Sequence, residues 1–143
     1  MKVVLDASVV VAAVATKNPQ SATRVLIQAA NAGVFDLVIT DAIEAEYRDA
    51  VEREKVKRAA PRLDRLAFVD ELVGMAVRVE VGEDVRVVAK DPKDDKYVTA
   101  ALAARAEFVV SFDRRHLVAI GEYEKVRFVT PGDFLAALRS STS

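Results

Sequence analysis

The segment Val3-Val4-Leu5-Asp6-Ala7-Ser8 joins three consecutive apolar residues to a carboxylate and a hydroxyl. A continuous apolar run predicts a strand that is buried on both faces, as in a parallel sheet. Residues 8–16 are rich in alanine and valine and predict a short helix directly after this strand. The chain is therefore expected to open as a strand followed by a helix, with an acidic residue at the carboxyl end of the strand.

The rest of the chain repeats this alternation of strand and helix. Asn18 and Pro19 predict an N-cap and a first helical position, and Gly33 is expected to close that helix. Thr40 and Thr130 are predicted to cap two later helices, the last running through Arg139. Further strands are predicted at residues 35–39, 77–81, 108–112 and 126–129. A fourth helix is marked by an apolar stripe of Leu63, Leu66, Val69, Val73 and Ala76.

This order of elements predicts an α/β fold with three layers, in which a mainly parallel central sheet lies between helices. The length of 143 residues suits one domain with its own core. We expect that domain at residues 1–139, followed by a flexible tail at residues 140–143. The apolar run at residues 9–15 is too short to span a membrane, which takes about 20 residues. The sequence therefore predicts a cytoplasmic protein.

Composition excludes several classes of function. The 21 basic and 22 acidic residues give a net charge of -1, which argues against a protein that coats nucleic acid through bulk positive charge. The sequence has no cysteine, which excludes disulfides, thiolate metal sites and cysteine nucleophiles. It has one histidine, which is too few for a histidine-rich zinc site.

Four acidic residues lie where the predicted fold would bring them together. Asp6 and Asp113 end two predicted strands, Glu46 lies on the helix after the second strand, and Asp94 opens a helix. In an open α/β sheet, ligands bind at the carboxyl ends of the strands. Neighbouring carboxylates repel one another, and a divalent cation is the usual remedy. The four acids therefore predict a carboxylate cluster around a metal ion.

Each acid also has an ordinary structural explanation. Asp6 is well placed to cap the helix that follows it, and Asp94 lies in the first turn of a helix, where its dipole favours a negative charge. Asp113 suits a turn, and Glu46 suits the solvated edge of a helix. These explanations do not account for the placement of all four acids at one end of one sheet.

Two of these positions have an acidic neighbour as an alternative. At about 100° per residue, Asp94 lies roughly 30° from the centre of the apolar stripe of its helix and Asp95 roughly 70°. Asp94 is therefore predicted to point more directly towards the sheet, with Asp95 as the alternative. Glu44 and Glu46 lie at opposite borders of one apolar face, and periodicity does not separate them. His116 is interpreted as a surface or turn histidine.

Taken in order, four segments resemble the PIN domain, the ribonuclease fold found in the toxin subunits of many prokaryotic toxin–antitoxin pairs. They are Val3-Val4-Leu5-Asp6-Ala7-Ser8-Val9-Val10, Ile43-Glu44-Ala45-Glu46-Tyr47, Asp91-Pro92-Lys93-Asp94-Asp95-Lys96-Tyr97 and Ser111-Phe112-Asp113. Ser8 fits the asparagine or serine that often follows the first family aspartate. In one departure from the family pattern, His116 stands where many members carry a further acid.

The resemblance implies metal-dependent hydrolysis of RNA phosphodiester bonds. Asp6, Asp94 and Asp113 would hold Mg²⁺ or Mn²⁺, two ions that suit oxygen ligands. Glu46 would complete the catalytic cluster or orient the attacking water. Ser8 would donate a hydrogen bond to the carboxylates that hold the ion. The resemblance also implies an RNA substrate, a homodimer, and an antitoxin protein that covers the carboxylates when the chain is a toxin.

Two other functions compete with this hypothesis. The first is a catalytically silent PIN-like module that binds a protein partner and holds metal weakly or not at all. The second is a phospho-receiver domain, which would need an aspartate pair at the first strand and a lysine beyond a late strand. Ser8 replaces the second aspartate and Lys125 precedes its strand, so this function ranks low.

Overall fold

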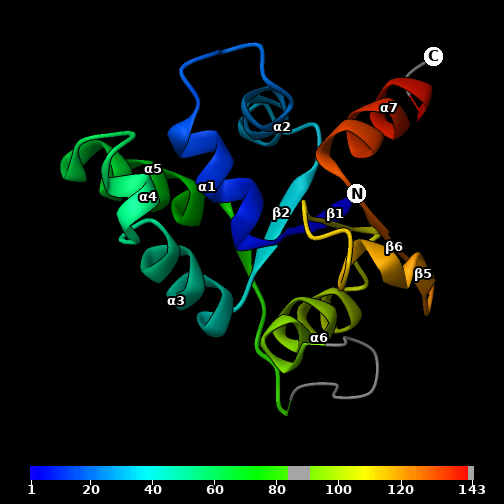
Figure 1. The fold of residues 1–143 in the computed structure, drawn as a ribbon. Coiled ribbons are helices and arrows are strands. Elements are labelled where there is room, and N and C mark those ends of the chain that lie inside the picture. Colours follow the sequence, from blue (N-terminus) through cyan, green and yellow to red (C-terminus); the bar gives the residue numbers. More distant parts are fainter. Residues whose placement is uncertain (84–90, 142–143) are drawn as a thin grey trace.

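The computed structural model describes residues 1–83 and 91–141, and these residues form a central sheet with helices on both sides (Figure 1). The sheet has the strand order β3-β2-β1-β4-β6-β5. All pairs of neighbouring strands are parallel except β5 with β6. Its strands are β1 Lys2–Leu5, β2 Asp36–Ile39, β3 Val77–Arg78, β4 Phe108–Val110, β5 Glu122–Tyr123 and β6 Val126–Val129. The predicted α/β fold with a mainly parallel sheet is confirmed.

The short strand β5 is a feature that the sequence did not reveal. It pairs with β6 in an antiparallel hairpin at the edge of the sheet. Glu124 and Lys125 form the turn with positive φ angles of 49° and 70°. Hairpin turns of two residues at positive φ usually contain glycine or asparagine, so this pair of charged residues carried no recognisable turn signal.

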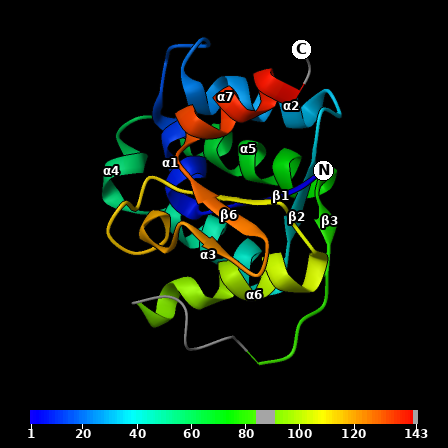
Figure 2. The same ribbon diagram turned by 90° about the vertical axis from the view of Figure 1, so that its right-hand side faces the viewer.

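The helices lie in two layers, one on each face of the sheet (Figure 2). One face is covered by α6, which contacts β1, β2 and β4, while α2 and α7 pack together over the other face. The α-helices are α1 Ala7–Ala15, α2 Ala22–Asn31, α3 Asp41–Ala50, α4 Glu54–Lys57, α5 Arg62–Met75, α6 Asp95–Ala104 and α7 Pro131–Ser141. Two single-turn 3-10 helices, η1 Pro92–Asp94 and η2 Val118–Ile120, complete the elements of the described ranges.

Several helix boundaries follow from identifiable capping residues. Thr40 Oγ1 accepts a hydrogen bond from the Ile43 backbone at 3.2 Å, so the predicted cap of α3 is confirmed. The predicted start of α2 at Asn18 is wrong, because Ser21 caps this helix by accepting from Arg24 N. Pro19 lies in the turn before it. At the other end of the chain, α7 continues to Ser141, two residues beyond its predicted end, and residues 142–143 lie outside the described ranges.

The apolar stripe predicted for α5 is correct at Val69, Val73 and Ala76 and wrong at its first residue, Leu63. The buried residues of α5 are Arg65, Val69 and Leu72, whereas Leu63 is 78% exposed. Arg65 donates hydrogen bonds to the carbonyl oxygens of Val51 at 2.6 Å and of Ala60 at 3.1 Å. These bonds satisfy the guanidinium group in the interior.

The core lies on both faces of the two central strands. Val3, Val4 and Leu5 of β1 are fully buried, as a continuous apolar strand requires. On the α7 side, Phe134 packs edge-to-face against Phe35 and Phe108, at centroid distances of 5.1 and 5.3 Å. Aromatic packing of this kind fixes α7 on the sheet.

Within the described ranges we find no helix that combines the length and the apolar character needed to cross a lipid bilayer.

Candidate active site

The two central strands end side by side at the edge where the acidic residues gather. Val3 pairs with Phe108 and Leu5 with Val110 in parallel register, so the segments after both strands begin at the same level of the sheet. The backbone N–H of Asp6 donates to the Val110 carbonyl at 2.9 Å and continues the ladder by one bond. The register therefore fixes Asp6 beside the segment that carries Asp113.

Two serines join Asp6 to the segment after β4. Ser8 Oγ and Ser111 Oγ both donate to Asp6 Oδ2, at 2.8 and 2.6 Å. Ser111 Oγ in turn accepts the backbone N–H of Asp113 at 2.9 Å, and Ser8 Oγ accepts that of Phe112 at 3.1 Å. Asp6 is 8% exposed, and these bonds hold its carboxylate in one orientation.

Asp113 organises the turn after β4 around its own carboxylate. Its Oδ1 accepts the backbone N–H groups of Arg115 at 3.1 Å and His116 at 3.0 Å. The Nδ1 atom of His116 lies 2.9 Å from Asp113 Oδ2. Partial burial raises the pKa of Asp113, but the hydrogen bonds from the side chain and backbone of His116 outweigh this effect and lower it. Asp113 is therefore an anion at neutral pH.

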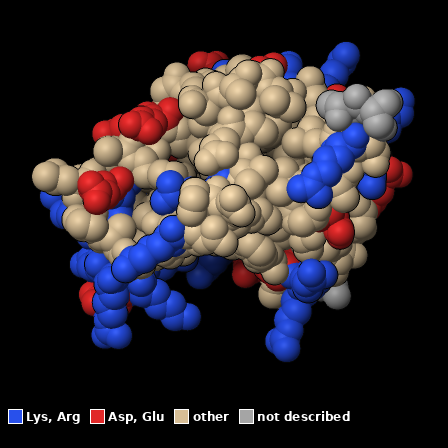
Figure 3. Space-filling view, turned by 90° about the horizontal axis from the view of Figure 1, so that it is seen from above, with Lys and Arg blue, Asp and Glu red and all other residues tan. Residues whose placement is uncertain are grey.

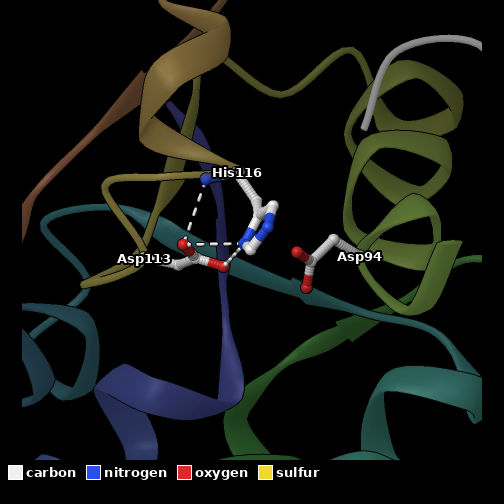
Figure 4. A group of neighbouring side chains, drawn as sticks. All are labelled: Asp94, Asp113 and His116. Carbon is white, nitrogen blue, oxygen red and sulfur yellow. Dashed lines mark hydrogen bonds and ion pairs between the residues drawn. The ribbon is translucent and has the colours of Figure 1, made fainter. Parts of the chain in front are cut away.

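Asp94 approaches Asp113 and His116 from the other side of the site. One potential ligand atom from each of the three residues lies within 4.8 Å of the others. Figure 4 shows the three side chains pointing toward one another, with Asp94 reaching in from the start of α6. Within residues 1–83 and 91–141, Asp94 Oδ2 is buried and has no hydrogen-bond partner. Burial and the negative charges of Asp6 and Asp113 raise the pKa of Asp94 to about 7.

Of the neighbouring aspartates Asp94 and Asp95, the one that was predicted to point more directly towards the sheet, Asp94, is the less buried. Asp95 is only 2% exposed, and Asp94 is the more accessible of the two. The reason is that α6 is buried around most of its circumference, so a residue about 70° from the centre of its apolar stripe still lies in the interior. Asp94 nevertheless belongs to the group with Asp113 and His116.

The two glutamates of α3 face different neighbours. Glu44 binds Arg48 and Arg78, and these hydrogen bonds lower its pKa. Glu46 instead lies 3.6 Å from the Nζ atom of Lys96 on α6 and 3.1 Å from Arg53. Glu46 is therefore on the α6 side of α3, and it stands next to the site rather than in the group of three.

Two buried tyrosines form hydrogen bonds with the backbone on either side of Asp6. Tyr47 donates its hydroxyl hydrogen to the Leu5 carbonyl at 2.5 Å, and Tyr97 Oη accepts the backbone N–H of Ala7 at 3.2 Å. Burial and the negative charge of Asp6 raise the pKa of both phenols, so both stay neutral. They fix the backbone on either side of Asp6.

The residues present fit a divalent cation with oxygen ligands. Asp94 has a buried carboxylate oxygen that lacks a hydrogen bond within the described ranges, and it is opposed by the charge of Asp113. A cation would neutralise this repulsion and occupy the open oxygen. The donors are mainly carboxylate oxygens, which suit Mg²⁺ and Mn²⁺.

His116 is the member of the group that sequence reasoning missed. The signal that would have found it is its position three residues after Asp113, within reach of that carboxylate across one turn. A histidine in a polar turn is common at protein surfaces, so this signal is weak without the partner on α6.

A family model described as PIN domain matches residues 2–115. The crystal structure of PAE2754 from Pyrobaculum aerophilum is similar to the chain, with a TM-score of 0.66 and 15% sequence identity. The similarity covers 98% of this chain and 90% of that one, and at this identity it shows the fold alone. Among curated proteins, no significant match was found.

Proposed function

The chain belongs to the PIN-domain family, whose members are generally nucleases, and from that premise we propose that it is a metal-dependent endoribonuclease. The observation that carries the proposal is the pairing of Asp94 with Asp113 from two elements that are distant in sequence. Two carboxylates that face each other at the carboxyl edge of a parallel sheet cost stability unless a ligand uses them.

The proposed roles follow from the contacts of each acid. Asp6, Asp94 and Asp113 would hold Mg²⁺ or Mn²⁺ directly or through water, and hydrogen bonds from Ser8 and Ser111 orient the Asp6 carboxylate. When bound, the ion would supply Lewis acidity towards the scissile phosphate and make water a better nucleophile at neutral pH. Glu46 would orient that water, because Lys96 and Arg53 hold its carboxylate next to the site.

Substrate binding would depend on local rather than overall charge. Arg114 and Arg115 are exposed directly after Asp113, where an RNA backbone would pass. Lys96 on α6 adds a third cation close to the acids. Arginine and lysine in such positions contact phosphate oxygens without reading the base sequence. These contacts support an RNA substrate for a chain whose net charge is only -1.

Partner proteins are part of the same proposal. The end of α1 and the start of α5 enclose a hollow of about 410 Å³, lined by residues that include Lys17, Arg24 and Phe68. The exposed Leu63 lies close by in sequence, on the first turn of α5. Figure 3 shows a further face, on the side of α2 and α7, with an uncharged centre between charged side chains. Such surfaces support a homodimer or a bound antitoxin. The enzyme would be cytoplasmic, and its lack of cysteine suits a reducing compartment.

Cleavage of a mixed RNA substrate with 5 mM Mg²⁺ or Mn²⁺ tests the proposal. We expect Asp6→Asn and Asp113→Asn each to reduce the cleavage rate at least about a hundredfold, because each removes charge that holds the ion. Asp64→Asn is the matched control, since Asp64 is an exposed aspartate in the first turn of α5. It should cleave RNA at the wild-type rate.

An Asp113→Asn variant that folds and still cleaves RNA as fast as wild type would refute the proposed nuclease site. Wild-type protein that binds neither ion and cleaves no RNA would instead favour the silent, protein-binding module. Calorimetric titration of each ion into chelator-treated protein separates these two outcomes, because it measures metal binding without a substrate.

A further inference from the structure

His116 stands at the site with a ring nitrogen that the hydrogen bonds of Asp113 do not use. Its Nδ1 atom lies 2.9 and 3.1 Å from the two carboxylate oxygens of Asp113. An ionised carboxylate only accepts hydrogen bonds, so Nδ1 carries the hydrogen and donates it. In the neutral ring this leaves the lone pair of Nε2 available to a ligand.

The same geometry is the usual arrangement of a metal-binding histidine. A histidine that binds a metal through one nitrogen generally donates its other N–H to a carboxylate or carbonyl, which fixes the tautomer and the ring orientation. In Figure 4, Nε2 lies on the Asp94 side of Nδ1. Asp113 therefore holds the ring at Nδ1. An ion on Nε2 would take Asp94 as its carboxylate ligand, and Asp113 would act on the ion through His116 rather than as a direct ligand.

We propose that His116 binds the divalent cation through Nε2, so that this site holds the ion with nitrogen as well as oxygen and prefers Mn²⁺ to Mg²⁺. This inference rests on the proposed metal-dependent function. Imidazole is a good ligand for transition metals, whereas Mg²⁺ favours oxygen ligands almost exclusively. One nitrogen among carboxylates therefore shifts the preference of the site towards the transition metal.

Pulsed electron paramagnetic resonance of the Mn²⁺-loaded protein gives a direct test. The sequence contains one histidine, so a coupling from an imidazole ¹⁴N nucleus in protein without an affinity tag belongs to His116. His116→Asn is the informative variant, because its amide can still donate to Asp113 while it lacks Nε2. His116→Asp converts the same position to a third carboxylate. Calorimetric titration with Mn²⁺ and with Mg²⁺ gives both affinities for all three proteins.

We expect a ¹⁴N coupling in the wild type that is absent in His116→Asn. We also expect Mn²⁺ binding to weaken at least about tenfold in His116→Asn, with a smaller change for Mg²⁺. In His116→Asp the preference should move towards Mg²⁺.

Two results would overturn the inference in different ways. If Mn²⁺ binds the wild type without ¹⁴N coupling, and His116→Asn keeps the wild-type preference, then His116 only positions Asp113 and the proposed nuclease function stands. If neither ion binds the wild type, both proposals fail together. The wild-type spectrum is decisive alone, so the test holds even if a variant fails to fold.

Discussion

Asp94→Asn should stabilise the metal-free protein, and by more at high pH than at low pH. The raised pKa of Asp94, about 7, reflects burial and the charges of Asp6 and Asp113. A carboxyl whose pKa is higher in the folded than in the unfolded protein stabilises the fold only while it is protonated. That contribution is complete below its ordinary pKa of 3.8 and is lost as the pH rises through 7. Asparagine has no charge to lose, so its variant should not show this loss.

The magnitude follows from the two pKa values. The difference, 7 minus 3.8, is about 3, and one pKa unit corresponds to about 1.4 kcal/mol, which gives an upper bound of about 4 kcal/mol. Asp94 is only half-buried, and solvent screens its repulsion from the other acids. We therefore expect the variant to gain about 1–2 kcal/mol over wild type at pH 8.5 and less than half of that at pH 5, because the loss begins near pH 3.8.

Urea denaturation with a chelator present, at intervals from pH 5 to pH 8.5, measures this difference in the free energy of unfolding. Asp64→Asn again serves as the control and should differ from wild type by less than about 0.5 kcal/mol at every pH. Adding Mg²⁺ or Mn²⁺ at pH 8.5 should reverse the order, because wild type then gains stability from binding and Asp94→Asn gains less.

Parallel stability curves for wild type and Asp94→Asn across this pH range would refute the reasoning. They would mean that Asp94 titrates as an ordinary surface carboxyl, and that its repulsion from Asp6 and Asp113 is relieved without a metal ion.

Four further substitutions test buried and exposed contacts of the fold, each by urea denaturation. Tyr47→Phe removes the hydrogen bond to the Leu5 carbonyl and should cost about 1–2 kcal/mol; an unchanged stability would show that this buried bond contributes nothing. Arg65→Met keeps the apolar stem but leaves the buried carbonyl groups unpaired, and should cost about 1.5–3 kcal/mol. Leu72→Ala should cost about 2–5 kcal/mol and Leu63→Ala less than about 0.5 kcal/mol, and equal costs would contradict the burial of Leu72 and the exposure of Leu63.

The alternation of strands and helices was predictable because local patterns carry it. Neighbours in sequence set the apolar run before Asp6 and the buried face of α3. They also set the helix caps Thr40 and Thr130. Where the prediction failed, a distant contact outweighed the local pattern. Arg65 is buried in α5 because carbonyl groups from the segment before it accept its hydrogen bonds, and the hairpin of β5 and β6 forms without the usual turn residues.

Some residues of the candidate site were likewise predictable from the sequence, and others were not. Asp6 and Asp113 were predictable as neighbours because parallel strands end at one edge of the sheet. Periodicity favoured Asp94 over Asp95 and did not separate Glu44 from Glu46. The assignment of Asp6, Glu46, Asp94 and Asp113 as catalytic residues stays a prediction, which the cleavage and titration experiments test.

The sequence by itself determined the order of the elements, the family and the acids at the strand ends, since these depend on short stretches of chain. Only the tertiary structure decided which acids face each other and that His116 joins them. Residues 94 and 116 lie on different elements, and their approach depends on how α6 packs across β1 and β4. Through-space distance sets both the repulsion between carboxylates and the ligands available to an ion, and sequence spacing does not encode that distance.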